Sequence, residues 1–278
     1  MGRKEGKWGL KRLENVFLLG WIGRQSMKVK TCVGVVFGVC LLVALKFLVK
    51  DHSHFFVASE AFHMIGTVIL IYKLTTHKTC SGLSLKSQEL TAIYLAVRLY
   101  CSIVLEEDIH MVLDFTTLVS TLWVIYMMRF KLKSTYIKEL DSMPMYYVVI
   151  PVSILAFLVH PYMRTRVVTS WLWAFCVYLE SVSVLPQLRV MQNAKMVETF
   201  TGHYIFALGV SRFFGCAHWI LRIIETRGSY LFLGIGYLWP SMALLAEIVQ
   251  TFILADFCYY YVKSVMHGQL LVRLPSPV

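Results

Sequence analysis

The sequence predicts an all-α membrane protein, built as a bundle of seven transmembrane helices with one further helix in front of it. Of the 278 residues, 58% are hydrophobic and only 15% are charged, and the mean hydropathy is +0.64. A water-soluble domain does not need this much apolar surface. Apolar runs close to the roughly 20 residues that cross a bilayer recur along the chain. Basic residues gather between alternate runs, as they do in multi-pass membrane proteins.

We expect eight membrane spans. The first is a signal-anchor helix rather than a cleaved signal peptide, because a long charged arm precedes it and no clear small-residue cleavage site follows. The other seven form one bundle at 54–262, since no linker rich in proline, glycine or serine interrupts them. The expected spans are 31–49, 54–72, 88–105, 110–129, 145–160, 167–188, 203–224 and 241–262.

The distribution of positive charge predicts the orientation. The first 30 residues hold eight of the 27 lysines and arginines. Placing this basic arm (1–30) in the cytosol puts the most basic loops and the tail (263–278) on the same side, as the positive-inside rule requires. Both termini are then cytosolic, and the net charge of +11 reflects membrane orientation rather than nucleic-acid binding. The arm itself is either an interfacial segment or a partly disordered tail.

The cysteines and the catalytic residue types exclude several classes. Seven cysteines stand singly, mostly inside apolar runs, without a CxxC pair. We therefore expect buried thiols, with no disulfide framework, no metal site and no cofactor. The sequence also lacks a nucleophile–base spacing and a phosphate-binding loop, so an enzyme is the least favoured class.

Three arginines lie inside runs that otherwise look like membrane spans: Arg98, Arg212 and Arg222. A guanidinium keeps its proton, and a charge at mid-helix costs roughly 2.5–3.5 kcal/mol on insertion scales. Few carboxylates in the spans obviously compensate this cost, so we expect a polar cavity that receives negative charge. Arg98 follows Gln88 by ten residues, and Arg212 follows His203 by nine. Both arginines should therefore lie near the bilayer midplane, in a weak parallel repeat.

The span at 203–224 carries a stripe of polar or small residues on one face. Its members are Arg212, Gly215, His218, Trp219 and Arg222. A stripe of this kind is unlike a lipid-facing surface, so we expect it to face the bundle interior. Arg222 lies near the luminal end, where it either serves the site or extends to the surface.

Other polar residues share helix faces at similar depth. Trp173 and Glu180 are seven residues apart, and Glu180 is either the countercharge of a site arginine or part of a structural salt bridge. His63 follows Glu60 by three residues and is the best choice for a pH-sensing group, with an ordinary packed histidine as the alternative. Further candidate partners are Asp114, Glu247 and Asp256.

Several segments carry a family pattern in one order. They are TCSGLSLKSQ at 79–88 followed by Arg98, YLESVSVLPQL at 178–188, Glu198-Thr199 with His203-Tyr204, and Asp256-Phe257. Together they resemble the KDEL receptors, which are the ER lumen protein-retaining receptors and are seven-helix relatives of the SWEET and PQ-loop transporters. The resemblance covers about residues 55–268.

The resemblance implies two triple-helix repeats of the SWEET/PQ-loop type and a luminal cavity. That cavity captures the C-terminal retention peptide of escaped luminal proteins in the Golgi and releases it in the ER. It also implies a multi-pass protein of the ER and Golgi membranes, with vesicle coat proteins as cytosolic partners. By position, Arg98 matches the arginine on the ligand's carboxylate, and Arg222 matches the arginine on an acidic ligand side chain. The other matched positions are His63, tied to pH sensing, and Trp173, Glu180, Arg212, Trp219 and Asp256.

The chain departs from the family pattern at several cavity positions. Phe56 stands where the family has an arginine, and Cys101 and Ser170 stand where it has acids. Other cavity residues are replaced by Leu99, Ser211, Gly215 and His218. The tail reads His267-Gly268-Gln269 in place of a lysine-rich coat signal. Selectivity for the family's tetrapeptide should therefore weaken or shift.

Two functions remain open. A divergent sorting receptor would hold a peptide carboxylate, with protonation of His63 favouring the bound state and Glu180 with Arg212 forming a switchable polar core. A PQ-loop-type transporter would move a small anionic or zwitterionic solute through the same midplane site.

Overall fold

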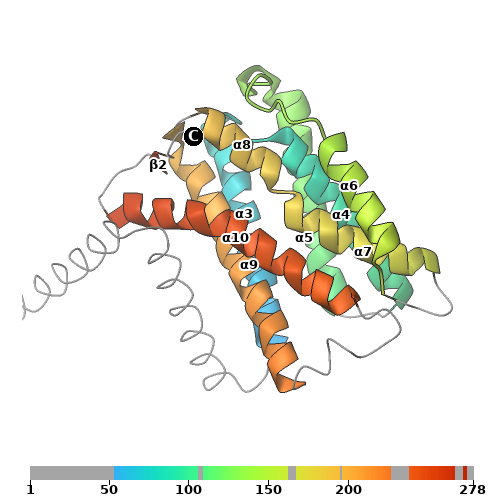
Figure 1. Cartoon of the computed structure of the whole chain (residues 1–278). Coiled ribbons are helices and arrows are strands. Elements are labelled where there is room, and N and C mark those ends of the chain that lie inside the picture. The colour runs from blue at the N-terminus through green and yellow to red at the C-terminus, as the bar shows by residue number, and fades with distance from the viewer. Residues whose placement is uncertain are drawn as a thin grey trace, which may run out of the picture. The chain divides into compact units, whose positions relative to one another are not determined.

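The computed structural model describes residues 53–105, 109–161, 167–194, 196–226, 238–266 and 272–273 (Figure 1). The expected arm (1–30) and anchor helix (31–49), with most of the tail, lie outside the described residues. Within these residues the α-helices are α3 (Ser53–Tyr72), α4 (Leu85–Leu105), α5 (Ile109–Tyr126), α6 (Tyr146–Leu158), α7 (Val167–Val182), α8 (Leu185–Ala194), α9 (Thr199–Glu225) and α10 (Trp239–Met266). Short π and 3₁₀ turns are η1 (Lys73–His77), η2 (Met127–Lys131) and η3 (Lys133–Thr135), and the strands are β1 (Met196–Val197) and β2 (Val272–Arg273).

Five stretches of the described helices are long and apolar enough to cross a membrane. They are Phe55–His77, Met111–Lys131, Val167–Ala194, Thr199–Glu225 and Trp239–Met266. Helix α6 is apolar but shorter, with 13 residues. Helix α4 has 21 residues and carries Arg98. The predicted all-α membrane class is confirmed, with a two-residue strand pair as a minor addition.

The helices follow the order expected from the sequence. Counting α7 and α8 as one interrupted span, α6 separates α3–α5 from α7–α10, which is consistent with two triplets of helices. The helix ends extend past several expected boundaries, most clearly at α8, which continues to Ala194, and α10, which continues to Met266. Such extension is physically reasonable because a helix continues beyond its apolar run into the polar headgroup region.

Two groups of apolar side chains hold the bundle together. The first joins α3, α9 and α10 and includes Leu70, Ile205 and Leu254; the second joins α4, α6 and α7 and includes Leu90 and Leu179. Helix α3 packs along α9, and α4 packs against both α5 and α7. The functional residues described below come from helices of both groups, so they lie where the two halves of the bundle meet.

A close approach between α9 and α10 depends on a glycine. A Cβ atom at Gly209 would overlap the sulfur of Cys258 on α10 and would also touch the Leu254 side chain. A larger residue at this position would require the Cys258 side chain to rotate away or α10 to shift. The contact matters for function because α10 contributes side chains to the polar interior.

The Pro-Gln pair at 186–187 separates α7 from α8. Helix α7 ends at Val182, and Pro186 lies in the first turn of α8, where its missing N–H costs no hydrogen bond. The Gln187 side chain donates to the Gly82 carbonyl (2.8 Å) and accepts from the Ser84 N–H (2.8 Å). The expected single span 167–188 is therefore interrupted after Val182, and Gln187 anchors the start of α8 to the loop before α4.

The same loop contacts an acidic residue of the 132–145 connection. The Ser84 hydroxyl donates to Asp141 Oδ1 (2.9 Å), and the Tyr136 hydroxyl donates to Asp141 Oδ2 (2.7 Å). Burial and then the hydrogen bond to Asp141 raise the pKa of the Tyr136 hydroxyl above its usual value. These contacts fix the end of the bundle that the sequence predicts to be cytosolic.

Strand β1 pairs antiparallel with β2 at the same end of the chain's helices. Met196 is the partner of Arg273, and Val197 is the partner of Val272. Because β1 immediately precedes α9, the pairing ties the residues after α10 to the connection between α8 and α9.

A buried lysine joins η1 to the start of α9. The Lys73 ammonium donates to the Ser81 carbonyl (2.8 Å) and to the Thr201 hydroxyl (2.7 Å), and pairs with Glu198 (2.8 Å). The lysine side chain is fully buried, whereas the Glu198 side chain is 38% exposed. A buried ammonium with three partners is satisfied at this position.

We expect Lys73→Met to loosen this corner without unfolding the bundle. The substitution keeps the apolar stem but removes three hydrogen bonds, each worth roughly 1.5–3 kcal/mol when one group is charged, while Glu198 can turn to water. Hydrogen exchange measured by mass spectrometry should become faster at 79–84 and 199–203. The matched control is the exposed Lys138→Met, which should leave exchange unchanged, and equal exchange in the two variants would contradict the assignment.

Candidate functional site

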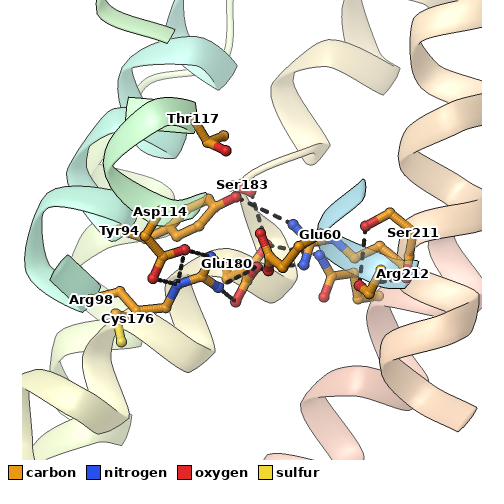
Figure 2. A network of polar contacts seen from close by, with 12 residues as sticks. Glu60, Tyr94, Arg98, Asp114, Thr117, Cys176, Glu180, Ser183, Ser211 and Arg212 are labelled. Atoms are coloured by element: carbon orange, nitrogen blue, oxygen red, sulfur yellow. Dashed lines mark hydrogen bonds and ion pairs between the residues drawn. The ribbon is translucent and has the colours of Figure 1, made fainter. Parts of the chain in front are cut away.

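Arg98 on α4 lies among three carboxylates from three other helices (Figure 2). Its Nε donates to both oxygens of Asp114 on α5 (3.1 and 2.9 Å), and Nη2 also pairs with Asp114. Its Nη1 donates to both oxygens of Glu180 on α7 (3.1 Å each). Its Nη2 reaches Glu60 Oε1 on α3 at 3.3 Å. Every nitrogen of this guanidinium therefore has a carboxylate partner.

Arg212 on α9 shares one of these carboxylates. Its Nη1 donates to Glu180 Oε1, and its Nη2 donates to the hydroxyl of Tyr94 (3.3 Å). Tyr94 is almost fully buried, and its ring also lies 5.7 Å from the Arg98 guanidinium carbon. Glu180 thus bridges the two arginines, and Tyr94 contacts both (Figure 2).

The two arginines occupy equivalent places on their helices. From Leu85 to Arg98 and from Thr199 to Arg212 there are thirteen residues in each case. At 1.5 Å per residue both side chains lie about 20 Å from the start of their helices. The predicted parallel repeat therefore has a structural counterpart, and its two basic residues meet at a common acid.

Hydrogen bonds between helices hold the surrounding backbone in place. The Ser59 hydroxyl on α3 donates to the Ser211 carbonyl on α9 (2.9 Å). On α10, Gln250 donates to the Glu180 carbonyl (3.2 Å), and Thr251 donates to the Arg212 carbonyl (3.3 Å). Rigid helix-to-helix contacts of this kind keep the charged groups in register.

The expectation that few carboxylates compensate the arginines is wrong. Arg98 has three acidic partners, and Arg212 has one. The sequence obscured this because Glu60 and Asp114 are far from Arg98 along the chain and only helix packing brings them close. In the described state, Arg98 is paired with internal acids rather than open to an anion.

The remaining predicted residues lie at different distances from this centre. His63 is buried on α3, one turn after Glu60, within electrostatic range of Arg98, Glu180 and Arg212. Trp173 is half-buried on α7, two turns from Glu180, and packs with the α4–α6–α7 apolar group.

The residues near the far end of α9 are less enclosed. Trp219 is half-buried, two turns beyond Arg212, and Arg222 is exposed one turn further on. The exposure of Arg222 fits either of the alternatives left open by the sequence, because the position is accessible to water and to a ligand alike.

Asp256 does not belong to the buried polar core, contrary to the prediction. Its side chain is exposed on α10, whereas Glu247 and Gln250 carry the polar groups of that helix into the interior. Nine residues separate Asp256 from Glu247, which is two and a half turns, so the two side chains leave opposite sides of the helix.

Sequence reasoning missed two members of the site, Tyr94 and Gln250, whereas Asp114 was named as a candidate partner. Tyr94 precedes Arg98 by four residues, and this i, i+4 spacing could have indicated a shared face. Gln250 follows Glu247 by three residues, and this i, i+3 spacing likewise could have indicated a shared helix face.

The positions that depart from the family pattern are apolar or weakly polar here. The Phe56 ring meets the His218 ring edge-on at 5.8 Å between centroids. Cys101 is fully buried against the Thr169 carbonyl, and Ser170 is buried beside it on α7. Within the described ranges no group of three or more histidine, cysteine, aspartate or glutamate residues has the arrangement of a metal site.

Comparison with known proteins identifies relatives across most of the chain. The family model described as "ER lumen protein retaining receptor" matches residues 79–222. A Caenorhabditis elegans protein, ER lumen protein-retaining receptor erd-2.2, is 33% identical over 80% of this chain and 98% of its own length. ER lumen protein-retaining receptor 3 of Mus musculus is 32% identical over 81% and 99%. The ER lumen protein-retaining receptor of Dictyostelium discoideum is 31% identical over 77% and 95%.

Proposed function

Because this chain belongs to the family of ER lumen protein-retaining receptors, we propose that it is a multi-pass receptor of the ER and Golgi membranes. Its ligand is the C-terminal retention signal of luminal proteins, which it binds for retrieval to the ER. The observation that carries the proposal is the pair of buried arginines at equal depth, Arg98 and Arg212, joined by Glu180. A guanidinium in a nearly dry interior is well suited to recognise a carboxylate.

The ligand's C-terminal carboxylate would bind at Arg98. Asp114 uses the Nε and Nη2 edge of that guanidinium, which is the edge that a bidentate carboxylate prefers. Asp114 therefore acts as an internal substitute for the ligand, and the described arrangement represents the ligand-free receptor. Binding replaces Asp114 with the carboxylate of the peptide, while Glu60 and Glu180 continue to hold the arginine.

Protonation of His63 would favour the bound state. The charged groups within electrostatic range of this side chain are Arg98 on α4, Glu180 on α7 and Arg212 on α9, and Glu60 lies one turn earlier on the same helix. A positive imidazolium here would pair with Glu60 and Glu180 and weaken their hold on Arg98. The arginine would then interact more strongly with an incoming carboxylate. Asp256 lies on the exposed side of α10 and has no role in this proposed step.

Direct binding to the purified full-length chain in nanodiscs tests the receptor function. We expect C-terminal tetrapeptides of the retention type to bind with a free carboxylate, and the same peptides with an amidated C-terminus to bind roughly 30-fold more weakly or worse. Losing one member of a buried charged pair costs about 2 kcal/mol or more. Arg98→Lys should show the same loss, because lysine retains the charge but not the forked geometry.

The exposed Glu139→Gln variant is the control and should bind like the unmodified chain. If free and amidated peptides bind equally well, or if no peptide of the panel binds the folded protein at any pH between mildly acidic and neutral, the proposed function is wrong.

A further inference from the structure

Four buried side-chain atoms lack a hydrogen-bond partner among the residues that the structure describes. Three are acceptors: one oxygen of Glu60, one oxygen of Glu247 and the amide oxygen of Gln250. The fourth is the Nε donor of Arg212. Buried acceptors without a donor are rare because each costs free energy. Here the three acceptors come from α3 and α10.

Two oxygen atoms from different helices converge on a glycine of α9. A Cβ atom placed on Gly215 would lie 3.4 Å from Glu247 Oε2 and 3.5 Å from the Ser59 hydroxyl oxygen. Gln250 follows Glu247 by one helical turn and therefore shares its face of α10. Gln250 is 2% exposed, and Glu60, the neighbour of Ser59, is 5% exposed. The missing side chain of Gly215 thus leaves a position bordered by oxygen atoms.

The balance of charge in this region is negative. The carboxylates are Glu60, Asp114, Glu180 and Glu247, and the guanidinium groups are Arg98 and Arg212. Glu247 lies within electrostatic range of Glu180, Arg212, Arg98 and Glu60. If all four carboxylates are ionised, they exceed the two arginines, and a bound cation would offset this excess because like charges repel strongly in a medium of low dielectric constant.

We propose that the position beside Gly215 is a cation site, in which Glu247 and the Ser59 hydroxyl, with Gln250 one turn further along α10, hold a small positive group. The chemistry fits an inorganic monovalent cation or a primary ammonium group, since both are bound by carboxylate and amide oxygens. The site is separate from the carboxylate-binding edge of Arg98. One consequence rests on the proposed function. If the site binds an ammonium group of the ligand, the receptor would select peptides with a basic side chain.

Thermal unfolding of the purified full-length chain, followed by tryptophan fluorescence at constant ionic strength and neutral pH, tests the site. Sodium, potassium and methylammonium chlorides are compared with N-methylglucamine chloride, whose cation is too bulky. We expect a saturable rise in the melting temperature with at least one of the small cations and none with N-methylglucamine. Sodium or potassium alone identifies an inorganic ion, and methylammonium identifies the ammonium mode.

Two variants connect the effect to the proposed residues. Glu247→Gln keeps the side-chain size and should weaken the apparent cation affinity at least about tenfold. Gly215→Ala adds a methyl group at ordinary contact distance, so the chain should fold with an unchanged melting temperature in N-methylglucamine but lose the saturable rise. The exposed Glu139→Gln should respond like the unmodified chain.

The cation site is wrong if all four salts have the same effect, or if both variants retain the response. Protons alone would then neutralise the excess carboxylates. In the same preparations, peptides with lysine are compared with their norleucine analogues, and free peptides with amidated ones. If peptides bind through a free carboxylate but no cation raises the melting temperature, the cation site is wrong and the receptor proposal is unaffected. If a cation raises the melting temperature but no peptide binds, the receptor proposal is wrong and the cation site is supported.

Discussion

Glu180→Gln is expected to lower the free energy of unfolding by about 3–5 kcal/mol, the range found when one member of a buried ion pair is removed. The carboxylate of Glu180 pairs with both Arg98 and Arg212. Arg98 keeps Asp114 and Glu60 after the substitution, so most of the cost arises at Arg212. That arginine would retain only neutral acceptors, the Tyr94 hydroxyl and the new amide oxygen, and would remain charged inside the bundle.

Thermal and detergent-induced unfolding of the purified protein measure this effect. Glu139→Gln makes the same chemical change on an exposed loop and should leave the melting temperature unchanged. Adding Arg212→Met to Glu180→Gln should restore much of the stability, because the unpaired charge disappears and an apolar side chain of similar length takes its place. If Glu180→Gln has the same melting temperature as the Glu139→Gln control, the network does not stabilise the fold.

The second large effect is expected on ligand binding rather than on stability. Asp114→Asn should raise the affinity for peptides with a free C-terminal carboxylate by about tenfold or more, which corresponds to 1.4 kcal/mol. The internal carboxylate on the Nε edge of Arg98 competes with the ligand, and an asparagine amide of the same shape competes less well. The variant should also unfold at a somewhat lower temperature, since Arg98 then keeps only two acids.

Titration of free and amidated peptides into the variant and the unmodified chain measures this competition. The gain should appear for free peptides alone, because the amidated peptides have no carboxylate to place on Arg98. A lower affinity for free peptides in Asp114→Asn would contradict the competition and would make Asp114 a positioning residue that holds Arg98 for the ligand.

The occupied state of Arg98 changes how the departures from the family pattern are understood. The positions at which the family resemblance implies acids are Cys101 and Ser170, and both are buried without charge. Asp114 on α5 and Glu247 on α10 supply negative charge to the interior. The ligand preference of this chain is therefore expected to differ from the family's tetrapeptide.

The local features of this protein could be predicted from the sequence. The apolar runs determine the membrane helices, because each helix satisfies its own backbone hydrogen bonds within one continuous segment. The similar positions of Arg98 and Arg212 along their helices follow from the fixed rise per residue and from the equal spacing of each arginine from its helix start. Pro186 fits the first turn of α8 for a local reason, since a proline there lacks only an N–H that would have no partner within the helix.

The identity of the arginines' partners could not be predicted in this way. Glu60 and Glu180 are 38 and 82 residues from Arg98 along the chain, so their contacts with it depend on how whole helices pack and rotate. Helix α10 illustrates the difficulty, because its few polar residues lie on opposite sides and no stripe marks its buried face. This is why Asp256 was expected inside together with Glu247.

The sequence alone therefore determined the membrane class and the family, since these depend on composition and motifs. Only the tertiary structure decided that Arg98 is held by Asp114, that Glu180 bridges both arginines, and that an unpaired oxygen of Glu247 lies beside Gly215. Those outcomes depend on the rotation of each helix about its axis, which is set by packing among all the helices together.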